Sequence, residues 1–109
     1  MLGKKKVDAV SETPYPNPDE GTVVCVVTEP MGGNYVKAIC MDGKERKLRI
    51  PGKLRHKVWI NVKDVVLVGK WEFDEGKGDI LYKYGRDEKK KLIEMGFLDP
   101  SLTEGVGEL

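Results

Sequence analysis

The sequence predicts an all-β protein, a small five-stranded barrel followed by one short C-terminal helix. Three observations support this fold class. Five stretches rich in Val, Ile and Leu are separated by Gly, Pro or Asp, as strands are by turns. Asp42-Gly43 joins two of these stretches and is the strongest short-range signal of a β-hairpin. The 109 residues suffice for one hydrophobic core and no second one.

The first two strands are expected at residues 22–29 and 34–41. The first is rich in Val and has apolar residues on both faces, so we expect both of its sides to be covered. The second alternates, which places Val36, Ala38 and Cys40 on one face.

The third strand is expected at residues 44–50. Because Asp-Gly favours positive φ at both central positions, we expect a type I′ turn before it. Alternation in this strand places three side chains on the inward face, namely Arg46, Leu48 and Ile50.

Residues 64–71 and 79–84 predict the fourth and fifth strands, and residues 85–95 predict a short helix. Asp87 is the expected N-cap of this helix, and Gly96 stands where a left-handed stop is common. A five-stranded barrel of this kind fits an OB-fold, which binds oligonucleotides on strands 2 and 3 and the adjacent loops. An SH3-like barrel is the alternative, and strand number and spacing do not separate the two.

The chain divides into three parts by composition. Pro14, Pro16 and Pro18 alternate near the start and favour an extended, solvated backbone. We therefore expect a flexible N-terminal tail at 1–20, an OB-fold RNA-binding domain with its C-terminal helix at 21–98, and a flexible, acidic C-terminal tail at 99–109.

The net charge of +1 conceals a basic central region. Residues 37–70 carry +7 and the rest of the chain carries −6. Four of the basic residues, Lys53, Arg55, His56 and Lys57, fall within five positions of the loop after the third strand. Such charges repel one another unless an anion neutralises them. Together with Lys37, Lys47 and Arg49 on the outward side of strands 2 and 3, they predict one continuous nucleic-acid-binding surface.

The aromatic residues allow two interpretations. Tyr35 shares the outward face and could stack on a base or contact the N-terminal segment. Trp59 follows the basic loop and could also stack, although a Trp between Val58 and Ile60 more often fills a core. We expect Trp71 and Phe73 to belong to the core.

Other site classes have little support. Cys25 and Cys40 could form one bridge, but without a visible leader we expect a cytoplasmic protein with two buried, reduced thiols. A single His and two strand cysteines give no metal-ligand spacing. The four acids of the fourth loop (Glu72, Asp74, Glu75, Asp79) are expected to form a solvated tip that repels phosphate. We find no catalytic triad and no phosphate-binding glycine loop, so no enzyme is expected.

Three stretches carry a resemblance to a known family. They are CMDGKERKLRIPGKLRHKVWI, KDVVLVGKWEF and GDILYKYGRDE, in that order. Over residues 21–98 the chain resembles translation initiation factor 1A of archaea and eukaryotes, the counterpart of bacterial initiation factor 1. The short tails are similar to those of the archaeal form.

The resemblance implies an OB barrel that binds the small ribosomal subunit at the A site. There, the loop at residues 52–59 is expected to enter the minor groove of the decoding-region helix of the small-subunit RNA. Lys53, Arg55, His56 and Lys57 match the basic loop of the family. The basic third strand of the family is matched by Lys44, Arg46, Lys47 and Arg49, although alternation turns Arg46 inward. The resemblance also implies cooperation with other initiation factors, including the subunit-joining GTPase.

Two alternatives remain open. One is a general single-stranded RNA-binding protein or RNA chaperone of OB-fold type, and the other is a protein-interaction barrel with an acidic partner. In each case we expect a monomer that needs no cofactor and no membrane.

Overall fold

The computed structural model describes residues 13–55 and 58–102. Five strands form a closed barrel in the order β1-β2-β3-β5-β4. Their bounds are Thr22–Pro30 for β1, Tyr35–Cys40 for β2, Glu45–Arg49 for β3, Val65–Lys70 for β4 and Lys77–Lys83 for β5. Only β3 and β5 pair in parallel, and the other neighbours are antiparallel. The predicted five-stranded OB-type barrel is therefore confirmed.

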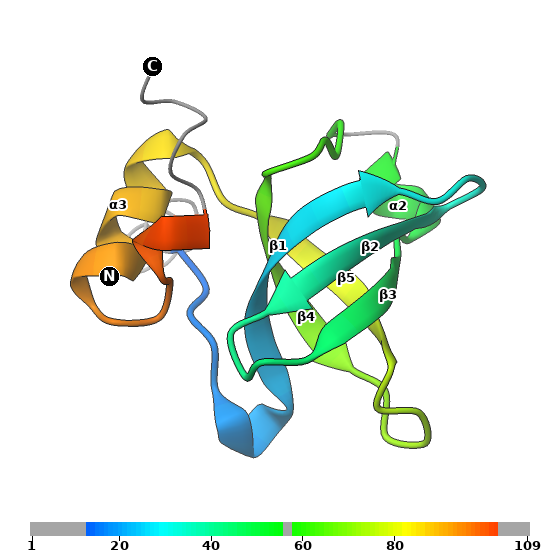
Figure 1. The fold of residues 1–109 in the computed structure, drawn as a ribbon, viewed down its shortest axis with the longest axis horizontal. Coiled ribbons are helices and arrows are strands. Elements are labelled where there is room, and N and C mark those ends of the chain that lie inside the picture. Colours follow the sequence, from blue (N-terminus) through cyan, green and yellow to red (C-terminus); the bar gives the residue numbers. More distant parts are fainter. Residues whose placement is uncertain (1–12, 56–57, 103–109) are drawn as a thin grey trace, which may run out of the picture.

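Two helices occupy different places on the barrel. Helix α3 (Arg86–Glu94) lies outside the barrel wall beside β1 and β4 (Figure 1). The four-residue helix α2 (Gly52–Arg55) follows β3 at one end of the barrel. The β2–β3 and β4–β5 turns lie at the other end (Figure 1). The loop after β3 and the β2–β3 turn are thus separated by the length of the strands.

Strand β1 is covered on both sides, as predicted. Val23, Cys25 and Val27 face the barrel interior, where they pack with residues of β2, β3, β4 and β5. Val24 and Val26 face outward against Leu92 of α3 and its neighbours. A strand buried on both faces loses the polar–apolar alternation, which explains its continuous apolar sequence.

The β2–β3 hairpin is confirmed, but its turn is not type I′. The amide of Gly43 donates to the carbonyl of Cys40 (2.9 Å), and the amide of Cys40 donates to the carbonyl of Lys44 (2.9 Å). Gly43 has φ 90°, whereas Lys63 is the only described non-glycine residue with positive φ. Asp42 therefore keeps an ordinary conformation, and Gly43 alone supplies the left-handed residue of a three-residue loop.

The C-terminal helix is confirmed with a different N-cap. Gly85 caps α3, and its amide donates to Oε1 of Glu88 at 2.7 Å. The expected cap, Asp87, lies inside the first turn instead, where a negative charge still favours the helix dipole. Gly96 follows with φ 83°, so the predicted left-handed stop is confirmed.

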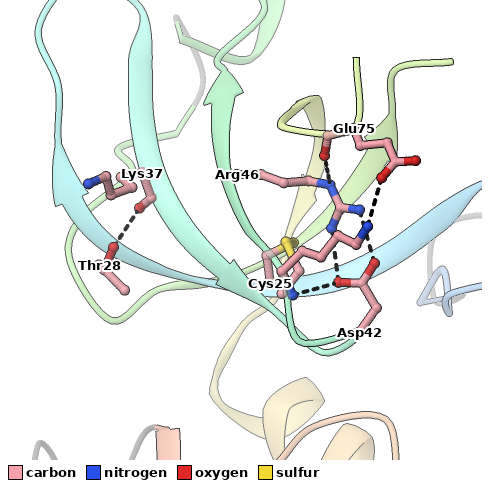
Figure 2. Close-up of a disulfide and its surroundings, with 8 residues drawn as sticks. Cys25, Thr28, Lys37, Asp42, Arg46 and Glu75 are labelled. Atoms are coloured by element: carbon pink, nitrogen blue, oxygen red, sulfur yellow. Dashed lines mark hydrogen bonds and ion pairs between the residues drawn. A yellow bond between two sulfur atoms is a disulfide. The ribbon is translucent and has the colours of Figure 1, made fainter. Parts of the chain in front are cut away.

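Cys25 and Cys40 are buried, as expected, but they form a disulfide. The expectation of reduced thiols is wrong for this structure. The two residues are direct register partners on β1 and β2, and both face the interior, so their side chains meet (Figure 2). The register of β1 with β2 brings the two sulfur atoms together, and the sequence alone did not reveal this register.

The part of the N-terminal segment that the structure describes contacts the folded domain. The hydroxyl of Tyr84 donates to the carbonyl of Pro14 at 2.6 Å. The hydroxyl of Thr13 donates to Glu88 at 2.8 Å, and the rings of Tyr15 and Phe97 stack with centroids 6.0 Å apart. Contacts with the barrel and α3 therefore begin before residue 21. Residues 1–12 and 103–109, the outer parts of the two predicted tails, lie outside the described residues.

Candidate nucleic-acid interface

The outward face of β2 and β3 gathers part of the predicted basic set. Lys37 lies directly opposite Lys47, and Tyr35 lies opposite Arg49. The intervening residue Val36 is buried, so the four alternate positions point away from the core. The predicted alternation of β2 and β3 therefore brings Tyr35, Lys37, Lys47 and Arg49 together on one face.

Lys37 and Lys47 form a like-charge pair across the hairpin. Like charges directly opposite one another destabilise a sheet. Within the described residues, neither ammonium has a carboxylate within 4.0 Å, although Glu29 is the β1 register partner of Lys37. The ammonium of Lys47 instead lies 4.8 Å from the centroid of the Tyr35 ring. This pair keeps its charge available to an external anion.

Arg49 has two neighbours on the same face. Its Nε lies 2.9 Å from Oδ1 of Asp79, and both side chains remain partly exposed. Its guanidinium carbon lies 5.9 Å from the Trp71 ring centroid, and the Lys77 ammonium lies 5.5 Å from the same centroid. Trp71 is therefore a half-buried surface ring between two cations. The prediction that Trp71 belongs to the core is wrong, because it follows the last residue of β4 and turns outward.

Arg46 is not available to RNA, so its assignment as a binding residue is wrong. It is 4% exposed. Its guanidinium nitrogens donate to both oxygens of Asp42 at 3.0 and 2.9 Å, and its Nε donates to the carbonyl of Glu75 at 3.0 Å (Figure 2). The hydrogen bonds from Arg46 hold the pKa of Asp42 below its usual value. Arg46 joins the β2–β3 and β4–β5 turns and is a structural residue.

Lys44 closes the β2–β3 turn and shares Glu75 as a contact with Arg46. Its ammonium lies 2.7 Å from Oε1 of Glu75, and the hydrogen bond lowers the pKa of Glu75. Both side chains are well exposed, so the contact is weak and open to exchange. Lys44 stays a candidate RNA-binding residue, but it is separate from the lysine pair of β2 and β3.

The acidic residues of the β4–β5 region do more than form a solvated tip. Glu75 pairs with Lys44, Asp79 with Arg49, and Asp74 with Lys77 at 3.8 Å. These carboxylates neutralise part of the predicted basic surface. The most exposed large apolar side chain of this loop is Phe73, at 96%. The prediction that Phe73 belongs to the core is wrong, since it stands in the loop beyond β4.

The loop after β3 is only partly described. Leu54 of α2 packs against the barrel core, and Lys53 is exposed beside it. Arg55 ends α2, whereas His56 and Lys57 lie outside the described residues. Of the four predicted cations of this loop, the structure therefore describes the exposed side chain of Lys53 and the backbone of Arg55.

Trp59 is 83% exposed, so the preferred interpretation as a core residue is wrong. Its neighbour Ile60 packs against the core instead. The carbonyl of Trp59 accepts a hydrogen bond from Nζ of Lys83 at 2.8 Å, and Lys83 also lies 3.3 Å from Asp64. These contacts hold the backbone while the indole projects into solvent. Trp59 keeps its alternative assignment as a candidate stacking residue.

Sequence reasoning missed Lys77 and Trp71 as members of this face. Lys77 becomes adjacent to Lys47 only through the parallel pairing of β3 with β5. This pairing joins residues far apart in the sequence, and local periodicity does not reveal it. Within 13–55 and 58–102, no three His, Cys, Asp or Glu side chains are grouped to hold a metal ion. In the same residues, no helix has the length and apolar character needed to span a bilayer.

Comparison with known proteins gives one consistent result. The family model described as "Translation initiation factor 1A / IF-1" matches residues 10–105. Translation initiation factor 1A of Desulfurococcus amylolyticus is 51% identical over 98 residues, which cover 90% of this chain and 84% of the relative. The factor of the same name from Saccharolobus solfataricus is 52% identical over 102 residues, covering 91% and 94%.

Among solved structures, one match is the solution structure of translation initiation factor 1 from the Wolbachia endosymbiont of Brugia malayi. It is 23% identical, with a TM-score of 0.48, and the match covers 66% of this chain and 85% of that one.

Proposed function

Because the chain belongs to the translation initiation factor 1A / IF-1 family, we propose that it binds the A site of the small ribosomal subunit and promotes assembly of the initiation complex. The proposed contact is the decoding-region helix of the small-subunit RNA. We include in the proposal cooperation with other initiation factors, among them the subunit-joining GTPase. The proposal contains no catalytic step.

The observation that carries the proposal is the lysine pair of β2 and β3. Lys37 and Lys47 face each other without an acidic partner among the described residues, and Tyr35 lies against Lys47. A sheet gains stability when such a pair is removed. An RNA phosphate placed between the two ammonium groups would attract both of them and offset their mutual repulsion.

The end of the barrel that bears α2 supports the proposed contact with the decoding-region helix. Lys53 and Trp59 project there from a loop whose backbone is anchored by Leu54, Ile60 and Lys83. A-form RNA presents a wide, shallow minor groove bordered by phosphates, which proteins read by shape and charge. A short helix with an exposed cation, followed by a loop with an exposed indole, fits such a groove. In this proposal, Arg55, His56 and Lys57 add charge to the same contact.

Binding to purified archaeal small subunits tests the proposal. We expect affinity to fall steeply with salt, and replacing Lys37 and Lys47 by Thr should flatten the log–log slope by about 0.7–0.9 per lysine. The same variant should be no less stable than the wild type, because it loses a like-charge pair. Lys90→Ala on α3 is the control, since Lys90 is an exposed lysine on a different element.

Three outcomes separate the candidate functions. An unchanged salt slope in the double variant would remove the lysine pair from the interface. Equal affinity for subunits and for free RNA oligomers would favour the general single-stranded RNA-binding alternative. Binding that depends on an acidic protein and not on RNA would favour the protein-interaction barrel.

A further inference from the structure

A small apolar pocket lies between the N-terminal segment, the start of β1 and the residues that follow α3. Its volume is about 230 Å³. Its apolar lining comes from four parts of the chain and consists of Pro16, Pro18, Val23, Val24, Met41 and Phe97. Figure 1 shows the N-terminal segment, in blue, passing from α3 to the start of β1, and this segment supplies the two prolines.

The wall formed by the N-terminal segment is held in place by specific contacts. The Tyr15 ring stacks on Phe97 with the centroids 6.0 Å apart, and the amide of Asn17 donates to Oγ1 of Thr22 at 2.7 Å. Two prolines in this short stretch fix their own φ angles and restrict the backbone further. The pocket is therefore already formed in this structure, with an apolar surface that gains stability when it is covered.

The size of the pocket limits what can fill it. Sites for drug-sized ligands and cofactors enclose about 300–1,000 Å³, and this pocket is smaller. It has room for an aliphatic side chain, so a peptide that inserts one such side chain is the fitting occupant.

The chain segments around the pocket are acidic. Residues 14–24 contain two acids and no Lys, Arg or His, and the same is true of residues 92–102. These four acids are Asp19, Glu20, Glu94 and Asp99. The first three are exposed and make no ion pair within the described part of the chain. Such surroundings favour a peptide that carries positive charge next to its apolar side chain.

The beginning of this chain has that composition. Residues 1–12 lie outside the described residues, but the sequence of residues 1–7, MLGKKKV, contains three lysines and no acid. Val7 precedes Thr13 by six residues, and Pro18 follows Thr13 by five. The hydroxyl of Thr13 is held by Glu88 at 2.8 Å. Because six residues span up to about 20 Å, a chain that turns back before Thr13 reaches the pocket.

We propose that residues 1–7 dock in this pocket of their own molecule, with Val7 inserted and Lys4, Lys5 and Lys6 beside the acidic residues around it. A tether of a few residues gives an effective concentration on the order of millimolar, so weak contacts suffice. The inference is independent of the ribosomal proposal, since neither the lysine pair nor α2 takes part. In the docked form the three N-terminal lysines lie at the β2–β3-turn end and are withheld from the RNA contact at α2.

The methyl resonances of the methionines provide the test in the full chain. Met41 lines the pocket, whereas Met31 follows β1 at the strand end opposite to Val23 and Val24. With methyl-labelled methionine, Val7→Asp should shift the Met41 resonance and leave the Met31 resonance in place. An unchanged Met41 resonance, with circular dichroism confirming the fold, would overturn the proposal.

A charge exchange tests the ionic part of the contact. Replacing both Asp19 and Glu20 by Lys should move the Met41 resonance toward its position in the Val7→Asp variant. Replacing the three N-terminal lysines by Glu in the same protein should return it toward the wild-type position. Glu29→Lys is the control, since Glu29 is an exposed acid at the other end of β1, and should have no effect. A combined variant that does not recover would contradict the pairing of these charges.

Two results would assign the pocket to another occupant. An intramolecular contact does not depend on protein concentration, so dilution should leave the Met41 resonance unchanged. A shift on dilution would overturn the proposal in favour of a second copy of the chain. A Met41 resonance that ignores Val7→Asp but shifts when small subunits are added would overturn it in favour of an external partner.

Discussion

Arg46 and Asp42 face each other across the β2–β3 turn in a two-pronged ion pair, with nitrogen–oxygen distances of 3.0 and 2.9 Å. The guanidinium side chain is only 3% exposed and makes its third contact with the carbonyl of Glu75. Arg46 therefore joins the β2–β3 turn to the β4–β5 turn.

Arg46→Ala should destabilise the protein by about 2–3 kcal/mol. The change removes hydrogen bonds to a charged group and leaves the Glu75 carbonyl without its partner, while the half-exposed Asp42 can be hydrated. Urea denaturation measures the loss. Lys47→Ala on the same strand is the control and should change stability by less than about 0.5 kcal/mol. A folded, equally stable Arg46→Ala protein that no longer binds subunits would return Arg46 to the RNA interface.

Stability should fall as the pH drops through the acidic range. The pKa of Asp42 is lowered from 3.8 in the folded protein by the hydrogen bonds from Arg46. A carboxyl whose folded pKa lies below its unfolded pKa stabilises the fold above the unfolded pKa, and this contribution is lost as the pH falls through the folded value. Asp42→Asn should therefore cost stability at pH 7, and its difference from the wild type should begin to shrink only as the pH falls below about 3.8 toward the lowered pKa of the folded state. Parallel melting curves from pH 7 to pH 3 would contradict the ion pair.

Reduction should lower the stability of the purified protein by about 3 kcal/mol. Cys25 and Cys40 are 15 residues apart, and a cross-link of this loop length restricts the unfolded chain by about that amount. Melting with and without a phosphine reductant measures the effect. A Cys25→Ala/Cys40→Ala variant is the control and should be insensitive to the reductant. Two free thiols titrated in the unfolded, unreduced protein would show that the bond is absent.

Trp59→Ala should leave the free energy of unfolding within about 0.5 kcal/mol of the wild-type value. The reason is that the indole is 83% exposed. Affinity for the small subunit should nevertheless fall, because the exposed indole belongs to the loop that follows α2. Ile60→Ala is the contrasting variant, and it should destabilise because Ile60 packs on the core. A large loss of stability in the Trp59 variant would place the ring back in the core.

The parts of the fold that follow from local pattern could be predicted from the sequence. The period of two placed Val36 and Ala38 inside, and the continuous apolar run of β1 indicated cover on both sides. Arg46 shows the limit of reasoning from charge. Its place in the alternation indicated the interior, and the structure follows the alternation.

The aromatic residues show the limit of reasoning from hydrophobicity. The interior of this barrel is filled by Val, Leu, Ala, Ile and the disulfide, so Trp59, Trp71 and Phe73 lie in loops outside it. Apolar residues are not excluded from protein surfaces, so their type alone did not decide their place. The contacts of Lys77 with Trp71 and Lys47 depend on barrel closure, a long-range property.

Chemical footprinting of the protein on intact archaeal small subunits tests the central claim most directly. The wild type should protect the decoding-region helix at the A site, and Lys53→Ala should weaken that protection while Lys90→Ala leaves it unchanged. Protection confined to another part of the subunit RNA, or the same loss in both variants, would contradict binding through the basic face and the α2 end.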